Sequence, residues 1–132
     1  DVVVLDCPPN LSLLSESIFK ASDAILVPVV PSPLSARTFA QLVDFFMQQG
    51  LDSSKLLPFF SMVQNVKGLH TVTMTRLLTD YPQQFFKSKI PFNADIEKMG
   101  IYFEPVIHRS ATGPAALSYQ ALYDELKAHL NA

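Results

Sequence analysis

The sequence opens on Asp1-Val-Val-Val-Leu-Asp6, a run of aliphatic residues that ends in a carboxylate. Apolar side chains at consecutive positions are typical of a strand covered on both faces, as in a parallel sheet that lies between helices. No polar segment precedes this run. We therefore expect the sequence to begin inside a strand and to be a piece of a longer protein whose neighbouring strands lie upstream.

The rest of the sequence alternates between extended and helical patterns. Continuous apolar runs predict further strands over residues 24–30, 56–63 and 85–90. Helical spacing of apolar residues predicts helices over residues 11–21, 35–49, 71–79 and 113–130, and residues 92–112 are expected to form an irregular loop. Strands that alternate with helices predict an α/β fold, with a parallel sheet and helices on both faces. We expect one three-layer domain over residues 1–132, truncated at its N-terminus.

The predicted helices have apolar faces that we expect to point inward. In the second helix Ser35 is the expected N-cap and Gly50 the expected terminator. The inward residues are expected to be Leu11, Leu14, Ile18 and Ala21 in the first helix, Phe39, Leu42, Val43 and Phe46 in the second, and Ala116, Leu117, Ala121, Leu122, Leu126 and Leu130 in the last.

Composition excludes several classes of protein. The chain has 132 residues, 48% hydrophobic and 17% charged, which suits one compact domain. Its four glycines are too widely spaced for a glycine-rich phosphate loop. A lone Cys7 can form no internal disulfide and, with three dispersed histidines, no zinc site, so we expect a cytoplasmic protein. No apolar stretch reaches the about 20 residues of a membrane helix.

Polar residues and prolines gather where the predicted strands end, which is where parallel sheets bind ligands. The four segments that follow the strands are Asp6-Cys-Pro-Pro-Asn10, Pro28-Val-Val-Pro-Ser-Pro33, Gln64-Asn-Val-Lys67 and Pro91-Phe-Asn-Ala-Asp95. A carboxylate at the tip of a buried strand needs a partner, and hydrated magnesium is one that nucleotide-binding sheets supply. The alternative is that Asp6 caps the following turn or helix.

These residues resemble a known family. Four segments, Val2 to Ser12, Ala21 to Pro31, Ile90-Pro-Phe-Asn93 and Pro105-Val106, together look like the C-terminal half of the ParA/MinD class of deviant-Walker P-loop ATPases, which implies a P-loop NTPase-like fold. The match is closest to the ParA, Soj-like, partition branch and spans essentially the whole chain. The Asp-x-Pro-Pro element is its most specific part.

The resemblance implies roles for individual residues. Asp6 matches the Walker B aspartate, which holds magnesium through water, and Cys7, Pro8 and Pro9 match switch II, which senses the γ-phosphate. The nucleotide base is expected to contact two further segments, whose candidate residues are Gln64, Asn65, Pro91 and Asn93. On the residues alone, Asn65 suits a turn and Pro91 a strand end equally well. At Asp95-Ile-Glu97 the match to the family is approximate.

The family's phosphate loop and its lysines have no counterpart in the 132 residues. Because those groups supply most of the phosphate affinity, we expect this chain alone neither to bind ATP tightly nor to hydrolyse it. The intact protein is expected to use ATP and Mg²⁺ and to dimerise with itself. An activating partner protein and non-specific DNA are further expected partners.

A net charge of −2 gives the whole chain no footprint for nucleic acid, so any DNA contact must be local. Lys67 and Arg76 are the candidate DNA-binding residues. Further cations that could contribute are Lys87, Lys89, Lys98 and Arg109. Ordinary solvated charge is the competing interpretation for all six.

Three functions remain open. The first is a ParA-type partition or cargo-positioning ATPase. The second is a P-loop enzyme similar to cobyrinic acid a,c-diamide synthase, and the third is a non-catalytic regulatory or dimerising module. Cys7 is expected to be a small buried residue rather than a nucleophile, because no histidine lies near it in the sequence.

Overall fold

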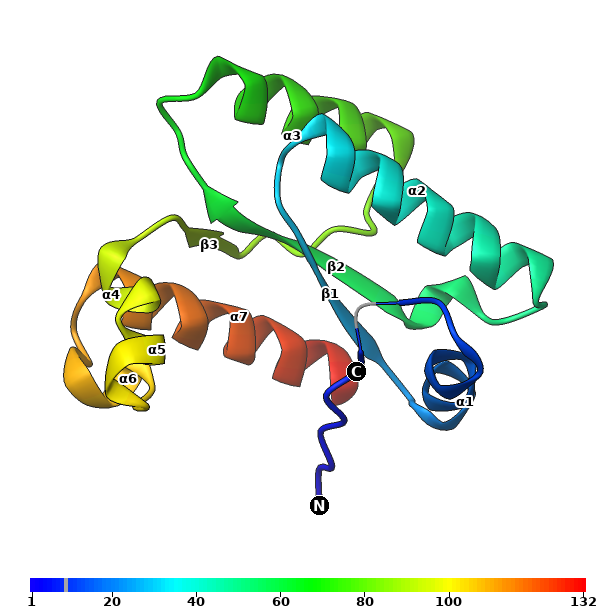
Figure 1. Ribbon diagram of the computed structural model, residues 1–132, viewed down its shortest axis with the longest axis horizontal. Helices are drawn as coiled ribbons and strands as arrows, with labels where there is room; N and C mark the ends of the chain where they lie inside the picture. The colour runs from blue at the N-terminus through cyan, green and yellow to red at the C-terminus, as the bar shows by residue number, and fades with distance from the viewer. Residues whose placement is uncertain (9) are drawn as a thin grey trace.

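A three-stranded parallel sheet in the order β1-β2-β3 forms the centre of the protein (Figure 1). The structure is a computed structural model that describes residues 1–8 and 10–132. β1 covers Ile25–Val29, β2 covers Leu56–Val63 and β3 covers Lys89–Pro91. Helices α2 and α3 lie on one side of the sheet, and α7 lies on the other with α4, α5 and α6 beside it (Figure 1). The predicted α/β class, a parallel sheet between helices, is confirmed.

The helices begin and end close to the predicted positions. Their bounds are α1 Leu13–Ala21, α2 Pro33–Gln48, η1 Ser53–Lys55, α3 Gly68–Asp80, α4 Ala94–Glu97, α5 Met99–Tyr102, α6 Val106–Arg109 and α7 Pro114–Leu130. The N-cap of α2 is Ser32 and not Ser35, because the Ser32 side chain accepts the Ser35 N–H and Pro33 occupies the first turn. Gly50, with φ +64°, follows the helix as predicted.

The predicted strand over residues 1–6 is wrong for this structure. Residues 1–6 lie outside the three-stranded sheet, and Val2, Val3 and Val4 are each more than 80% exposed. A strand covered on both faces is stable only where neighbouring strands and helices bury it, and in the described residues none covers this segment. The predicted strand over 85–90 is also shorter than expected, since only Lys89–Pro91 pairs with β2.

Helix α1 buries a face other than the predicted one, and α7 buries only part of its predicted face, at Ala116 and Leu122. In α1 the buried residues are Ser15 and Phe19, whereas the predicted inward residues Leu14 and Ala21 are exposed, as is Leu11 before the helix. In α7 the buried residues are Ala115, Ala116 and Leu122, whereas the predicted core residues Leu117, Ala121 and Leu130 are exposed. The sheet has only three strands, so it covers just part of each helix. The predicted face of α2 is correct at its centre, where Phe39 and Phe46 are buried.

Residues 92–112, predicted as irregular, contain three single-turn helices. Asn93 caps the first through its side-chain Oδ1, which accepts the Asp95 N–H at 2.8 Å. The second ends at Phe103, whose φ of 52° lies in the left-handed region although its side chain is 93% exposed. Such short helices lack an apolar period, which is why the sequence pattern did not indicate them.

Strand β2 carries the core on both of its faces. Phe60 faces α2 and α3 with Val29, Phe39 and Met74, and its ring stacks on Phe85 with centroids 4.5 Å apart. The neighbouring Leu57 and Phe59 pack on the opposite face with Phe86, Ile90 and Leu122 of α7. The strand therefore reads as an apolar run because each face is covered by helices.

Pro58 lies in this central strand without disturbing the pairing with β1. Its carbonyl accepts the Phe86 N–H at 2.8 Å, so this residue directs its backbone groups toward the α3–β3 connection and away from β1. β3 begins only at Lys89, opposite Phe60, and the missing N–H of Pro58 therefore removes no ladder bond.

The carboxyl end of β2 contains a bulge. Pairing with β3 shifts in register between Phe60 and Val63, and Met62 has a left-handed φ of 53°. The extra residue changes the alternation, so that Val63 packs in the same cluster as Phe60. The last residue of the strand is thus anchored in the core, and the chain leaves the sheet immediately after it.

Glu125 of α7 holds the segment that leads into β3. Its two carboxylate oxygens accept the backbone N–H groups of Lys87 at 2.7 Å and Ser88 at 2.8 Å. Partial burial raises the pKa of Glu125, but the hydrogen bonds from Ser88 and Lys87 outweigh it and hold this pKa below its ordinary value of 4.5. The ionised carboxylate is therefore the stabilising form.

We expect Glu125→Gln to lower the free energy of unfolding by about 1–2 kcal/mol at pH 7, because charge-assisted bonds to two N–H groups are weakened. The contribution of Glu125 is fully present above pH 4.5 and is lost as the pH falls through the lower pKa of the folded state. Urea denaturation at pH 7 and pH 3 measures both effects. Asp124→Asn, at the neighbouring exposed position, is the control, and an equal loss for the two variants would contradict the anchoring role.

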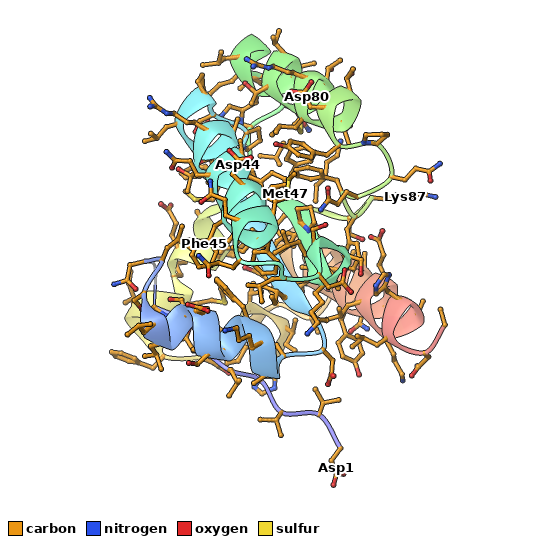
Figure 2. The ribbon with its side chains drawn as sticks, turned by 90° about the vertical axis from the view of Figure 1, so that its right-hand side faces the viewer. Asp1, Asp44, Phe45, Met47, Asp80 and Lys87 are labelled. Carbon is orange, nitrogen blue, oxygen red and sulfur yellow. The ribbon has the colours of Figure 1, made fainter. Side chains whose placement is uncertain are left out.

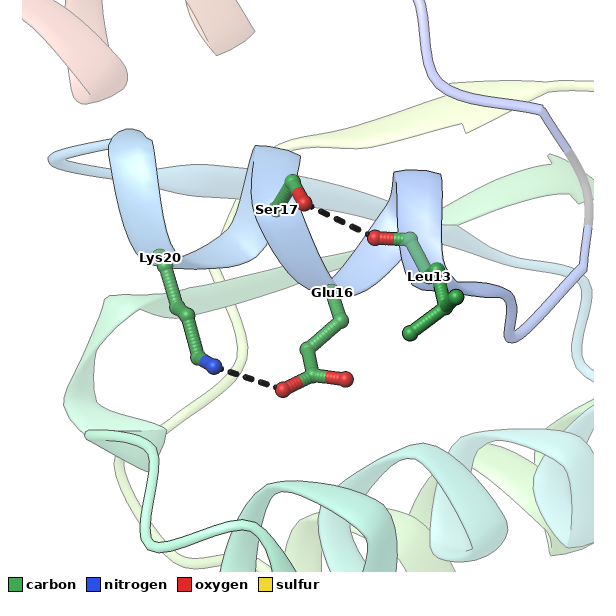
Figure 3. A network of polar contacts seen from close by, with 4 residues as sticks. All are labelled: Leu13, Glu16, Ser17 and Lys20. Carbon is green, nitrogen blue, oxygen red and sulfur yellow. Dashed lines mark hydrogen bonds and ion pairs between the residues drawn. The ribbon is translucent and has the colours of Figure 1, made fainter.

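Polar side chains pair locally on the surface of α1. In α1, Lys20 Nζ lies 2.6 Å from Glu16 Oε1, and the Ser17 hydroxyl donates to the Leu13 carbonyl at 2.9 Å (Figure 3). Asp44 and Met47 of α2 lie on its exposed side, and Asp1 ends a segment that extends away from the body of the protein (Figure 2). Within the described residues, no helix combines the length and apolarity needed to cross a membrane.

Candidate nucleotide-base site at the carboxyl edge of the sheet

Two loops meet at the carboxyl edge of the sheet. Val63 ends β2 and pairs with Pro91, the last residue of β3. The Phe92 N–H then donates to the Val63 carbonyl at 3.0 Å, one residue beyond the end of β3. The segments that begin at Gln64 and at Phe92 therefore leave the sheet side by side. These are the two segments predicted to contact a nucleotide base.

The loop after β2 is a tight turn. The Lys67 N–H donates to the Gln64 carbonyl at 3.0 Å, and the Lys67 carbonyl in turn accepts the His70 N–H at 3.0 Å at the start of α3. Gln64 is half-buried, whereas Asn65 and Val66 are exposed. The turn predicted as the alternative role of Asn65 is present. It leaves the side chain of this residue exposed at the edge.

His70 fixes the beginning of this turn. Its side chain is 6% exposed, and its Nδ1 accepts the backbone N–H of Gln64 at 3.1 Å. Both backbone polar groups of Gln64 are thus bonded inside the protein. No pattern in the sequence indicates this role, because a lone histidine in a short helical segment has no characteristic spacing.

The loop after β3 is held by a cap. Asn93 uses its Oδ1 to accept the Asp95 N–H, which leaves its side-chain amide available as a donor. Pro91 is half-buried and ends the strand, the alternative role considered for it, while Phe92 beside it is 44% exposed. Backbone groups, one side-chain amide and an aromatic ring are the kinds of groups that contact a planar heterocycle.

The N-terminal candidates lie elsewhere. Cys7 packs against the cluster of Phe19, Phe46 and Leu56, and Leu56 is the first residue of β2. Asp6 beside it is exposed, and Pro8 is half-buried. The structure thus brings Gln64, Pro91 and Asn93 together but places Cys7 at the opposite end of β2. Pro9, the third switch candidate, is outside the described residues.

Ser15 ties the segment after Cys7 to α1. It is fully buried, its hydroxyl donates to the Asn10 carbonyl, and its N–H donates to the Ser12 side chain at 3.4 Å. Ser15 is therefore on the buried side of α1, where the sequence pattern predicted Leu14. The orientation of α1 therefore depends on hydrogen bonds to the preceding loop as well as on apolar packing in the core.

Three of the six candidate cations contact a local partner. Arg76 lies 3.5 Å from Asp80, and Lys98 lies 3.3 Å from Asp95. The Arg109 guanidinium lies over the Tyr102 ring at 3.5 Å from its centroid. The other three cations are exposed: Lys67 lies just before α3, and Lys87 and Lys89 lie on either side of Ser88.

Two open hollows lie at the other, amino, edge of the sheet. Their volumes are about 380 and 460 Å³, and they share Leu57, Gln83, Gln84 and His129. They are thus separated from the candidate base site by the length of β2. In the described part of the chain, no group of three His, Cys, Asp or Glu side chains is placed to hold a metal ion.

Comparison with known proteins gives a consistent set of relatives. A family model described as AAA domain matches residues 1–55. The chain is 27% identical over 127 residues to the virulence plasmid ParA family protein of Chlamydia psittaci, covering 96% of this chain and 49% of that protein. It is 26% identical to the chromosome partitioning protein ParA of Myxococcus xanthus, covering 96% and 46%. With the sporulation initiation inhibitor protein Soj of Bacillus subtilis it shares 23% identity, covering 98% and 53%. The chain thus spans about half the length of these relatives.

Proposed function

We propose that this chain, which is similar to ParA family proteins along almost its whole length, carries the base-binding side of a partition or cargo-positioning ATPase. The carboxyl edge of the sheet, with Gln64, Asn65, Pro91 and Asn93, is the proposed contact surface for the adenine base. The intact protein would bind ATP with Mg²⁺, dimerise in that state, and hydrolyse the nucleotide when a partner protein acts on it.

One observation carries the proposal. The hydrogen bond from Phe92 to the Val63 carbonyl joins the two loops that the resemblance independently assigns to the base. Parallel sheets bind ligands beyond the carboxyl ends of their strands, and these loops occupy that position. The side-chain amides of Asn65 and Asn93 can both donate and accept, as recognition of a purine edge requires.

Asp6 is proposed as the magnesium residue, and Cys7, Pro8 and Pro9 as the switch, on the resemblance to the family alone, because this structure places Cys7 at the opposite end of β2 from the base loops. The carboxylate of Asp6 is an exposed oxygen ligand of the kind that Mg²⁺ prefers, so the residue fits the ion chemically. When bound, the ion would neutralise charge on the phosphates. A single carboxylate binds Mg²⁺ weakly, and we therefore expect Asp6 to matter only when nucleotide phosphates share the ion.

Lys67 and Arg76 are proposed as minor contributors to DNA binding by the intact protein. Lys67 is exposed beside the base loops, whereas Arg76 is partly neutralised by Asp80. If this surface follows a phosphate backbone, the affinity of the intact protein for DNA falls steeply as salt concentration rises.

Titration of Mg·ATP into the chain, followed by amide NMR signals, tests the base site. We expect weak binding, with a dissociation constant of about 1 mM or higher, because the phosphate-binding groups of the family are not among these residues. The shifts are expected at Gln64, Asn65, Phe92 and Asn93. Asn65→Ala is expected to weaken the response, and Asn131→Ala, at the exposed end of α7, to leave it unchanged.

Magnesium triphosphate without a base is the matched ligand control. It carries the charge of ATP but no ring, so it should leave the two loops unshifted. Loops that respond equally to both ligands, or to neither, would exclude the proposed base contact. A micromolar dissociation constant for ATP by calorimetry would show that the phosphates are already well bound, contrary to the expected division of the site.

A further inference from the structure

We propose that His70 is a positioning residue for the base loop: its Nδ1 fixes the backbone of Gln64, so that Gln64 and Asn65 present their side chains at the carboxyl edge in one defined arrangement. This inference rests on the proposed function, because it assigns a role toward the same base site. His70 itself does not touch the ligand, since it lies beneath the turn and is 6% exposed.

The hydrogen bond between His70 and Gln64 comes directly after the bulge that ends β2. The bulge at Met62 changes the alternation of β2 just before the loop, and Met62 adopts its left-handed φ although it is not a glycine. A backbone in this region costs free energy unless the surroundings hold it. On one side of the bulge Phe60 is locked in the core, and on the other Val63 is bonded through its carbonyl to Phe92. The His70 bond to Gln64 is the next contact along the chain.

The hydrogen bond also defines the state of the imidazole ring. A ring nitrogen that accepts an N–H carries no proton, so Nδ1 is unprotonated and the proton of the neutral ring is on Nε2. An acceptor is therefore needed at the δ position of residue 70. Asparagine offers one there, because its Oδ1 lies about as far along the side chain as Nδ1. Glutamine places its oxygen one bond further out.

Three variants separate positioning from simple space filling. His70→Ala removes the acceptor, His70→Asn restores it at the δ position, and His70→Gln offers it at the wrong distance. Loss of one hydrogen bond of about 0.5–1.5 kcal/mol corresponds to about 2- to 13-fold in an equilibrium constant. We expect His70→Ala and His70→Gln to speed exchange of the Gln64 amide proton and to weaken Mg·ATP binding by about this factor. His70→Asn should recover most of both losses.

His108→Ala is the matched control, because His108 is an exposed histidine of α6 and its removal should change neither measurement. Long-range ¹⁵N spectra of the unmodified chain provide a test that needs no variant, and they should show His70 with an unprotonated Nδ1. A protonated Nδ1 in the neutral ring would overturn the inference even if His70→Ala failed to fold.

The nucleotide titration distinguishes the two ideas. If the unmodified chain responds to Mg·ATP at both loops but His70→Ala binds it equally well, the base site stands and the positioning role is wrong. If the unmodified chain shows no response at either loop, the proposed base site is wrong and His70 positions nothing toward a base. Reduced binding by His70→Ala with recovery in His70→Asn, and none in His70→Gln, supports both.

Discussion

Replacing Phe60 with alanine is expected to lower the free energy of unfolding by about 3–5 kcal/mol. The side chain is 1% exposed at the centre of the middle strand, and its ring stacks on Phe85 at an interplanar angle of 17°. Truncation removes buried apolar area and leaves a cavity between the sheet and the α2 and α3 layer. Because Phe39 also contacts Phe85 edge-on, the aromatic cluster cannot close over the space without losing other contacts.

Urea denaturation followed by circular dichroism measures this loss. Phe103→Ala makes the same chemical change at a side chain that is 93% exposed, and it should alter stability by no more than about 0.5 kcal/mol. Similar midpoints for the two variants would mean that the stacked pair is not part of the stabilising core.

The second large effect is expected for Val29→Asp. Val29 ends β1 and is 2% exposed within the cluster around Phe39 and Phe60. A carboxylate there would lose its hydration without gaining a partner, so it must either remain protonated at neutral pH or disrupt the cluster. We expect a loss of about 4 kcal/mol or more at pH 7, a large part of the about 5–15 kcal/mol that holds a typical domain together.

Leu26→Asp is the control on the same strand, because Leu26 is 40% exposed and a carboxylate there stays hydrated. Thermal unfolding at pH 7 compares the two variants, and we expect the control to lose about 1 kcal/mol or less. Stability should partly return to Val29→Asp on acidification, since the protonated form is less costly to bury. Equal tolerance of aspartate at both positions would place this end of β1 at the surface.

A strand or helix could be predicted from the sequence where its apolar pattern corresponds to side chains that are buried in the structure. β2 was predicted with its observed bounds because helices cover both faces of Leu56–Val63, so that apolar residues occur at consecutive positions. The same pattern at Val2–Leu5 predicted a strand that the structure lacks. A local run of β-branched residues favours extended backbone, but a strand forms only if it pairs with another strand, and that partner lies far away in the sequence.

The candidate site was also predictable only in part. Gln64, Asn65, Pro91 and Asn93 were identified because they follow predicted strands, and the structure places the two segments side by side. The left-handed backbone of Met62 was beyond prediction, since methionine is not a residue that typically adopts it. The contact between His70 and Gln64 depends on how α3 returns over the end of β2, which is a tertiary feature. The roles assigned to Asp6, Cys7, Pro8 and Pro9 stay predictions.

The parallel pairing of the sheet has a consequence for the time course of folding. Ile25 pairs with Leu56, and Phe60 pairs with Lys89, so each ladder joins residues about 30 positions apart. Neither ladder can form as a local hairpin, and each must close a long loop that contains a whole helix. Folding should therefore be limited by the simultaneous docking of α2 and α3 with β2, and slower than in a helical bundle of equal length. Newly made chains would expose β2, whose side chains pack in the core on both faces of the sheet, until both crossovers are complete.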